Sequence, residues 1–132
     1  MKGYSLNLER EVLTNEYFRR VLYTTKNCQL VIMCLKPGEE IGEETHELDQ
    51  FIKCEAGEGK SIIDGVEHAL SEGFAVVVLA GSKHNIMNTS SNVHLKLYTV
   101  YAPPNHRDGV MHQNKAEADK DDEHFDGVVS DL

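Results

Sequence analysis

The residues best suited to chemistry lie in two separate stretches of the chain. Glu44 and His46 are two positions apart, so on an extended backbone their side chains point to the same face. Gln50 shares that parity, and His84 follows much later, directly after a turn-like Ala-Gly-Ser-Lys run. All four side chains offer oxygen or nitrogen donors that can ligate a metal. They can act together only if the fold brings two distant strands side by side.

Most of the chain shows the pattern of short strands separated by tight turns. From residue 17 onward, short runs are rich in β-branched and aromatic residues and alternate with turn residues. Asp64-Gly65 is the dipeptide preferred by a two-residue type I′ hairpin, in which both central residues need positive φ. The pattern predicts a β-sandwich or small barrel. The predicted strands are 18–25, 29–36, 50–55, 60–64, 66–70, 74–79, 84–89 and 93–101.

The two ends of the chain do not follow the strand pattern. Residues 1–16 are expected to form an N-terminal arm, extended or with one helical turn within 6–17, and residues 17–104 the barrel. Residues 105–132 are expected to form an acidic, His-containing tail that is disordered or loosely docked, with a short exposed helix at 115–122. Seven acids against two lysines give residues 113–132 a charge of −5, more than half of the total of −9.

The first of two spaced motifs surrounds Glu44. In this region the cupin family reads Gly, five residues, His, any residue, His, three or four residues, Glu, six residues, Gly. This chain resembles that pattern, with matching offsets at Gly38, Glu44, His46, Gln50 and Gly57. Glu44 stands in place of the first histidine, and Gln50 stands in place of the glutamate.

The second motif surrounds His84. The family reads Gly, five residues, Pro, any residue, Gly, two residues, His, three residues, Asn. The matching positions here are Gly73, Leu79, Gly81, His84 and Asn88. Leu79 replaces the proline, which affects only the rigidity of a turn. The resemblance covers 38–88 directly and extends to 17–101 with the flanking strands.

The resemblance to cupins implies both a fold and a metal site. The implied fold is all-β, a double-stranded β-helix or jelly-roll barrel. The implied ligands of one divalent transition metal (Fe, Mn, Ni, Co or Zn) are Glu44, His46, Gln50 and His84. One carboxylate and two imidazoles suit non-haem Fe(II), and the amide oxygen is a weaker donor, so modest affinity is expected. A metal-free pocket is the alternative that the two exchanged ligands leave open.

Further residues can be assigned to the interior only by strand parity. Arg19 and Arg20 are adjacent, so one faces the interior and could anchor an anionic substrate; Arg20 is assigned that role. Tyr98 and Tyr101 have opposite parity, and Tyr98 is assigned the second substrate contact. The histidines of the trailing segment are interpreted as solvated, although a lid over the pocket is the alternative; they are His106, His112 and His124.

Composition limits the classes of partner. The length fits one domain, and the acidic balance opposes nucleic-acid binding. No stretch has the length of apolar residues that a membrane span needs. Charged residues at 9–11 interrupt the place of a signal peptide, so a cytoplasmic location is expected. Three cysteines without metal-binding spacing are expected to be buried thiols.

Two functions remain open at this point. One is a metal-dependent enzyme, an isomerase, dioxygenase or lyase, acting on a small oxygen-bearing organic molecule such as a sugar, keto acid or phenolic. The other is a non-catalytic barrel that binds or senses a small ligand, with or without metal. An open-ended barrel leaves a free edge, and the arm at residues 1–16 could pair across a two-fold axis, so a homodimer is expected.

Overall fold

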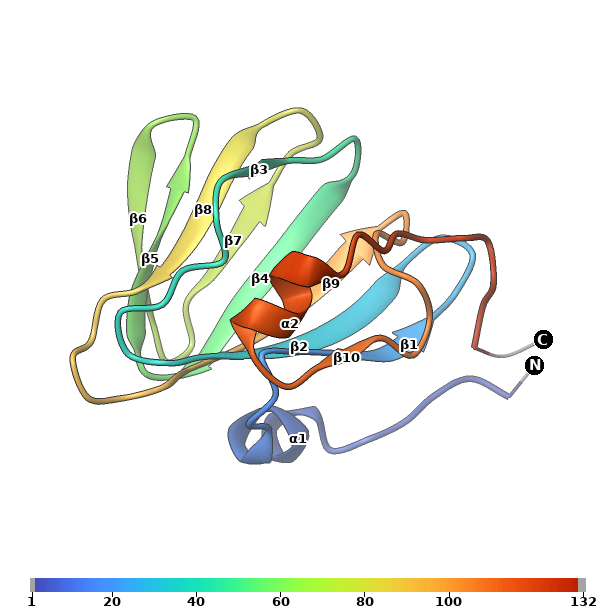
Figure 1. Ribbon diagram of the computed structural model, residues 1–132, viewed down its shortest axis with the longest axis horizontal. Helices are drawn as coiled ribbons and strands as arrows, with labels where there is room; N and C mark the ends of the chain where they lie inside the picture. The colour runs from blue at the N-terminus through green and yellow to red at the C-terminus, as the bar shows by residue number, and fades with distance from the viewer. Residues whose placement is uncertain (1, 131–132) are drawn as a thin grey trace.

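Alternating inward and outward residues fold most of the chain into two antiparallel sheets that face each other (Figure 1). The computed structural model describes residues 2–130. All eight predicted strands are present, with ends shifted by at most two residues, which confirms the all-β prediction. The elements are α1 (Leu8–Thr14), β1 (Arg19–Thr24), β2 (Gln29–Leu35), β3 (Glu44–Thr45), β4 (Asp49–Ala56), β5 (Glu58–Ile63), β6 (Val66–Ser71), β7 (Ala75–Val78), β8 (Lys83–Asn88), β9 (Leu95–Ala102), β10 (Met111–His112) and α2 (Lys115–Lys120).

The six-stranded sheet has the order β10-β1-β2-β9-β4-β7, and the four-stranded sheet has the order β3-β8-β5-β6. The apolar core lies between them. In β9, Leu95 and Leu97 face inward, and in β4 Ile52 and Cys54 do the same. This burial on alternate positions follows from the two-residue period of a strand. Polar residues on the same inward faces, further along β4 and β9, are therefore carried into the interior as well.

Two glycine-containing turns have clear physical causes. At the β5–β6 hairpin, Asp64 has φ 47° and Gly65 has φ 82°, so the predicted hairpin with two positive-φ residues is confirmed. Gly57, the last residue of the first motif, has φ 92°, and a Cβ there would lie 2.3 Å from the carbonyl oxygen of His94. Only glycine fits this close approach without moving the backbone.

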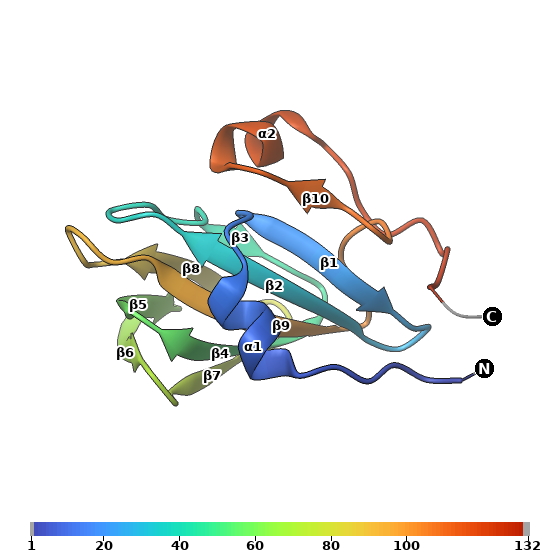
Figure 2. The same ribbon diagram turned by 90° about the horizontal axis from the view of Figure 1, so that it is seen from below.

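The N-terminal segment packs on the barrel of its own chain. Asn7 caps α1, because its side-chain oxygen accepts a hydrogen bond from the backbone N–H of Arg10 at 3.1 Å. Val12 on α1 is fully buried, and Figure 2 shows α1 lying against the six-stranded sheet near β4 and β9. The Tyr4 ring stacks on Tyr23 with centroids 4.6 Å apart. The predicted helical turn in the arm is confirmed.

The interpretation of the trailing histidines as solvated is wrong for His106 and His112, although more than half of residues 105–130 are exposed. β10 pairs with β1, placing His112 opposite Arg19. Val110, His106 and His112 are all buried. Two hydrogen bonds from the buried side chain of Gln29 hold the backbone of His106 in place. The Oε1 of Gln29 accepts from the His106 N–H at 2.9 Å. Its Nε2 donates to the His106 carbonyl at 2.7 Å. Of the three histidines of this segment, only His124 is exposed.

The remaining expectations about composition have simple outcomes. Cys28, Cys34 and Cys54 are free thiols; the second and third are buried and the first is partly buried. Within residues 2–130, no helix is long and apolar enough to cross a membrane.

Candidate functional site

The four side chains predicted to hold a metal come together between the two sheets. Glu44 of β3 is the register partner of His84 of β8. His46 lies just after β3, and its Nε2 is 2.9 Å from Oε2 of Glu44. The His46 and His84 rings have centroids 5.1 Å apart. Gln50 points inward from β4 and lines a small void together with Glu44 and His84.

That void is about 10 Å³ in volume and is also lined by Tyr101 and Asn85. A space of this size holds about one water-sized group. Gln50 is buried, and its Nε2 donates to Thr99 Oγ1 at 3.1 Å, but its Oε1 has no hydrogen-bond partner. An unpaired buried oxygen is costly, because it has given up its water without gaining a donor. The site therefore has an acceptor available for a cation or a water molecule.

His84 is held in the orientation and tautomer that suit a metal ligand. Its Nδ1 lies 3.0 Å from the carbonyl oxygen of Ser82. A carbonyl only accepts, so Nδ1 carries the hydrogen, and in the neutral ring Nε2 keeps its lone pair. Metal-binding histidines are commonly oriented in this way by a backbone carbonyl.

Glu44 is kept ionised by its surroundings. Burial alone would raise the pKa of Glu44, but the hydrogen bond from His46 and the nearby His46, Arg19 and His84 outweigh burial. The pKa therefore lies below its usual 4.5. A carboxylate that is charged at neutral pH is the form that ligates a metal.

The donor set fits a divalent cation by its chemistry, and the metal stays a prediction. Within residues 2–130, no three His, Cys, Asp or Glu side chains are grouped closely enough to hold a metal ion as they stand. Glu44 and His46 are bonded to each other, and the fourth predicted ligand is an amide. The unpaired Gln50 oxygen, the Nε2 lone pair of His84 and the ionised Glu44 are nevertheless the donors that such a cation takes.

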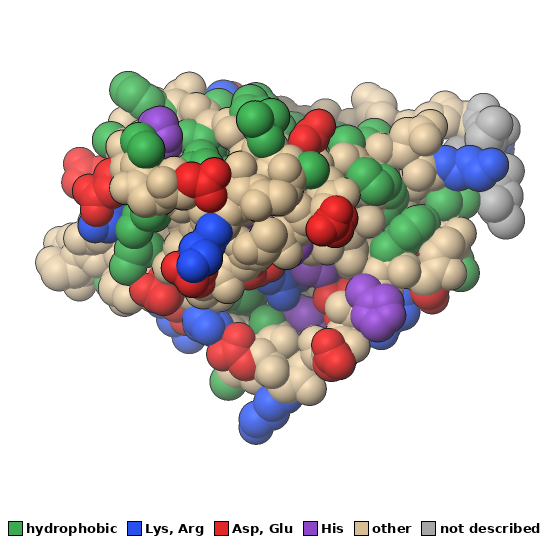
Figure 3. All heavy atoms as spheres, turned by 90° about the horizontal axis from the view of Figure 1, so that it is seen from above, with side chains coloured by type: hydrophobic (Ala, Val, Ile, Leu, Met, Phe, Trp, Pro, Cys, Tyr) green, Lys and Arg blue, Asp and Glu red, His purple; other side chains and the backbone are tan. Residues whose placement is uncertain are grey.

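A larger cavity opens beside this group. It has a volume of about 360 Å³, and Figure 3 shows a hollow on this face with basic and imidazole side chains at its floor. It is enclosed by β1, the segment leading into β3, and the trailing segment with α2. Its lining residues are Phe18, Arg19, Ile41, Gly42, Glu43, Glu44, His46, Asn105, His106, Ala118, Asp119 and Glu123.

The assignments of Arg20 and Tyr98 to the interior are wrong. Arg20 points outward, with its side chain 38% exposed and 4.0 Å from Glu11. Tyr98 packs near Phe51 on the outer face of the six-stranded sheet. The inward positions belong to Arg19 and Tyr101, which are both buried. A β-bulge between Val21 and Tyr23 changes the parity within β1, so alternation alone could not decide between the two arginines.

Sequence reasoning missed a carboxylate, an imidazole and a phenol that meet in the same region. Glu123 Oε2 lies 2.7 Å from His106 Nδ1, and His106 Nε2 lies 3.4 Å from the Tyr101 hydroxyl. Tyr101 in turn packs edge-on against His46, with centroids 6.1 Å apart. Burial raises the pKa of Tyr101, so the phenol keeps its proton at neutral pH. No spacing in the sequence links position 123 with position 106, because the contact depends on how the trailing segment folds back.

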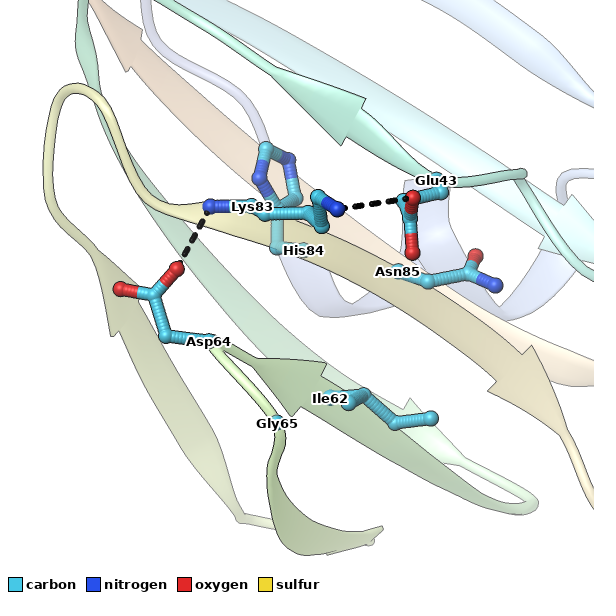
Figure 4. Close-up of a pocket in the computed structure, with 7 residues that line it drawn as sticks. All are labelled: Glu43, Ile62, Asp64, Gly65, Lys83, His84 and Asn85. Atoms are coloured by element: carbon cyan, nitrogen blue, oxygen red, sulfur yellow. Dashed lines mark hydrogen bonds and ion pairs between the residues drawn. The ribbon is translucent and has the colours of Figure 1, made fainter.

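A second pocket, of about 520 Å³, lies on the other side of His84, between β5, β8 and the segment before β3 (Figure 4). Its charged side chains already have hydrogen-bond or ion-pair partners within the pocket. The Lys83 N–H donates to Asp64 at 2.9 Å, and the Lys83 ammonium lies 3.6 Å from Glu43. This pocket has no free donor or acceptor comparable to Gln50, so the chemistry is better placed between the sheets.

Comparison with known proteins identifies relatives over most of the chain. The cupin domain family matches residues 31–101. An uncharacterized protein, L612, of Acanthamoeba polyphaga mimivirus is 42% identical over 112 residues, covering 82% of this chain and 70% of that protein. The uncharacterized protein YrkC of Bacillus subtilis is 40% identical over 124 residues, covering 89% of this chain and 66% of that protein.

Among solved structures, the protein BH2720 from Bacillus halodurans superposes with a TM-score of 0.88. It is 35% identical, and the match covers 91% of this chain and 96% of that one. The chain spans only about two thirds of the length of the two sequence relatives. Similarity of this extent shows the family and the fold of the shared region.

Proposed function

Because this chain belongs to the cupin family, we propose that it binds one divalent transition metal through Glu44, His46, Gln50 and His84. The proposed ligand of that metal is a small oxygen-bearing organic molecule, such as a sugar, keto acid or phenolic. The observation that carries the proposal is the unpaired Gln50 oxygen beside a void also lined by Glu44 and His84. Two motifs distant in sequence supply these residues to one place.

A bound divalent metal would act as a Lewis acid, polarising an oxygen of the substrate. The chain's own residues supply the remainder of the environment. Ser82 fixes the ring of His84, and Thr99 holds the Gln50 amide with its oxygen free. Tyr101 and His106 can hold a proton at the phenol oxygen and the ring Nε2 near the site. These features suit isomerase, oxygenase or lyase chemistry, in which a carbonyl or hydroxyl oxygen is activated.

Elemental analysis of untagged protein purified without chelator tests the proposal. The parent should contain close to one transition metal per chain, and Glu44→Ala, His46→Ala and His84→Ala should each lose it. His124→Ala is the matched control, because His124 is exposed and far in sequence from the motifs. Equal metal content in the parent and in His84→Ala would assign the metal to another part of the chain and defeat the proposal.

A non-catalytic ligand-binding barrel is the second candidate. The observation that favours it is the neutral amide of Gln50 at the position where the family pattern has a carboxylate, because a weaker donor lowers metal affinity. A thermal-shift screen against sugars, keto acids and phenolics, followed by turnover assays under air and under nitrogen, separates the two. Tight binding without turnover in either atmosphere would favour the binding protein.

The homodimer and the cytoplasmic location stay predictions. The arm expected to cross a two-fold axis packs on its own barrel through Val12 and Tyr4. The edge strands β6 and β7 carry the exposed side chains of Val66 and Val77, which is the kind of edge that pairs with another chain. Light scattering at micromolar concentration tests the dimer, and a monomer would remove it.

A further inference from the structure

Arg19 is a buried guanidinium without a carboxylate partner. The residue is only 8% exposed, and residues 2–130 place no carboxylate at ion-pair distance from it. Its Nε–H is buried and has no acceptor. A buried N–H without an acceptor is costly, so this group is expected to meet an acceptor when the protein functions.

The trailing segment holds Arg19 in place through the imidazole of His112. Arg19 Nη1 lies 3.3 Å from Nδ1 of His112, and His112 Nε2 lies 3.0 Å from Asp121. A guanidinium only donates, so Nδ1 of His112 accepts from Arg19 while Nε2–H donates to Asp121. The guanidinium also lies 5.3 Å from the centroid of the Phe18 ring. Arg19 is therefore held from two sides, while its Nε–H has no acceptor and is available to a ligand.

The other charged residues of the cavity already have partners of opposite charge or imidazole partners. These pairs are Glu43 with Lys83 at 3.6 Å, Glu44 with His46 at 2.9 Å, Asp119 with Lys115 at 3.0 Å and Glu123 with His106 at 2.7 Å. The partners of Glu44 and Glu123 are imidazoles, and the nearby charge of Arg19 contributes to lowering the pKa of both carboxyls. What Arg19 lacks is therefore an acceptor for its buried Nε–H.

We propose that Arg19 binds the carboxylate of a small organic acid whose second oxygen-bearing group lies toward Glu44 and His46. The proposal rests on the proposed function and narrows its ligand class from sugars, keto acids and phenolics to small organic acids with a second oxygen-bearing group. Arg19 and the two site residues line the same cavity, whose volume is at the lower end of small-molecule pockets. The planar fork of arginine matches a carboxylate through two parallel hydrogen bonds. Phosphate also presents oxyanions that arginine binds, so the test must distinguish phosphate from a carboxylate as the ligand of Arg19.

Calorimetric titration of the full chain with malonate tests the proposal, with neutral malonamide as the matched ligand control. Malonate should bind, and malonamide should bind at least about tenfold more weakly. Arg19→Met should weaken malonate binding about tenfold or more. Arg20→Met is the matched protein control, because Arg20 is the exposed neighbour, and it should stay within about twofold of the parent.

Each other outcome decides against the proposal. Unchanged malonate affinity in Arg19→Met, no malonate binding by the parent at millimolar concentration, or tighter binding of phosphate than of malonate would overturn it. If Arg19→Met does not fold, Arg19→Lys decides, because lysine keeps the charge but lacks the planar fork and should still weaken malonate binding.

Metal content measured on the same preparations distinguishes this proposal from the proposed function. The metal content of Arg19→Met should equal that of the parent, because Arg19 is not one of the proposed ligands. A metal-free parent that binds malonate through Arg19 would defeat the metal proposal and keep this one. A parent that contains metal but binds malonate equally well after Arg19→Met would defeat this proposal and keep the metal proposal.

Discussion

Two groups of polar side chains differ in how completely they are paired. The strand group comes from the two sheets and consists of Glu44, His46, Gln50 and His84. The tail group comes from the trailing segment and consists of His106, His112, Asp121 and Glu123. In the tail group each imidazole lies at hydrogen-bond distance from an acid, at 2.7 Å and 3.0 Å. In the strand group the Gln50 oxygen has no partner, and Ser82 leaves the Nε2 of His84 with its lone pair.

This difference separates residues that can bind from residues that position. A satisfied pair stabilises the segment that carries it and has little left to offer a ligand. A group with free acceptors is destabilising until something occupies it, which is the usual condition of a binding site. The tail group therefore builds one wall of the cavity and fixes Arg19, while the strand group is suited to coordinate.

The largest effect expected from this division is on metal affinity. His84→Ala removes an imidazole donor and should lower the affinity for a divalent transition metal more than about 100-fold, beyond the usual effect of outer residues. His106→Ala removes a paired imidazole and should change the affinity less than about tenfold. Competition titration with a chromophoric chelator measures both variants. Equal losses of metal affinity in His84→Ala and His106→Ala would contradict the distinction between the strand group and the tail group.

The next largest effect is on stability and belongs to the tail group. His106→Ala leaves the buried carboxylate of Glu123 without its imidazole, with the Arg107 N–H as its remaining bond. The free energy of unfolding should fall by about 2–3 kcal/mol, as for a lost hydrogen bond to a charged group. Urea unfolding measures it. The exposed pair of Lys60 and Glu67 is the control, and Lys60→Ala should cost less than about 1 kcal/mol.

Replacing the neutral ligand sharpens the comparison within the strand group itself. Gln50→Glu exchanges an amide oxygen for a carboxylate, and Thr99 can then donate where it now accepts. Metal affinity should rise about tenfold, because an anionic oxygen is a stronger donor. Without metal the same variant should be less stable than the parent, since a second carboxylate is buried near Glu44. Weaker metal binding in Gln50→Glu would remove Gln50 from the ligand set.

The strand group was predictable from sequence because its positions match the spacing of two motifs. The resemblance supplied the offsets of Glu44, His46, Gln50 and His84, since β3 ends at Thr45 and leaves His46 outside any strand. The eight longer strands each had enough residues to show their pattern. β3 and β10 have only two residues each, which is too short for any periodicity to appear.

The tail group was not predictable, because its burial depends on contacts between residues far apart in sequence. Gln29 and His106 are clamped together across the chain, yet Gln29 reads as an ordinary polar residue at the start of a strand. A segment rich in acids is usually solvated, since burying charge is costly. Here the cost is offset because Glu123, whose side chain is 3% exposed, bonds to the imidazole of His106 in the same segment. The choice of Arg20 over Arg19 failed for a related reason, a bulge in β1 that sequence alternation does not reveal.

The smallest effect is a pH dependence that the tail group adds to stability. Burial lowers the pKa of His106 below its usual 6.5, although the hydrogen bond to Glu123 opposes that shift. The unfolded chain therefore binds more protons than the folded one between the folded pKa and 6.5, and stability must fall as pH decreases through this window. Burial of Glu123 alone would raise its pKa, but the hydrogen bond from His106 outweighs burial. The pKa of Glu123 therefore also lies below its usual 4.5. That carboxylate adds a second loss of stability below about pH 4.5.

His106→Gln isolates the first of these two losses. Glutamine can still donate to Glu123 but does not titrate, so the fall in unfolding free energy between about pH 7.5 and pH 5.5 should be smaller than in the parent. His124→Gln is the control, because His124 is exposed and should leave the slope unchanged. Parallel pH profiles for the parent and His106→Gln would mean that this imidazole titrates as it does in the unfolded chain, and that its burial has no electrostatic consequence.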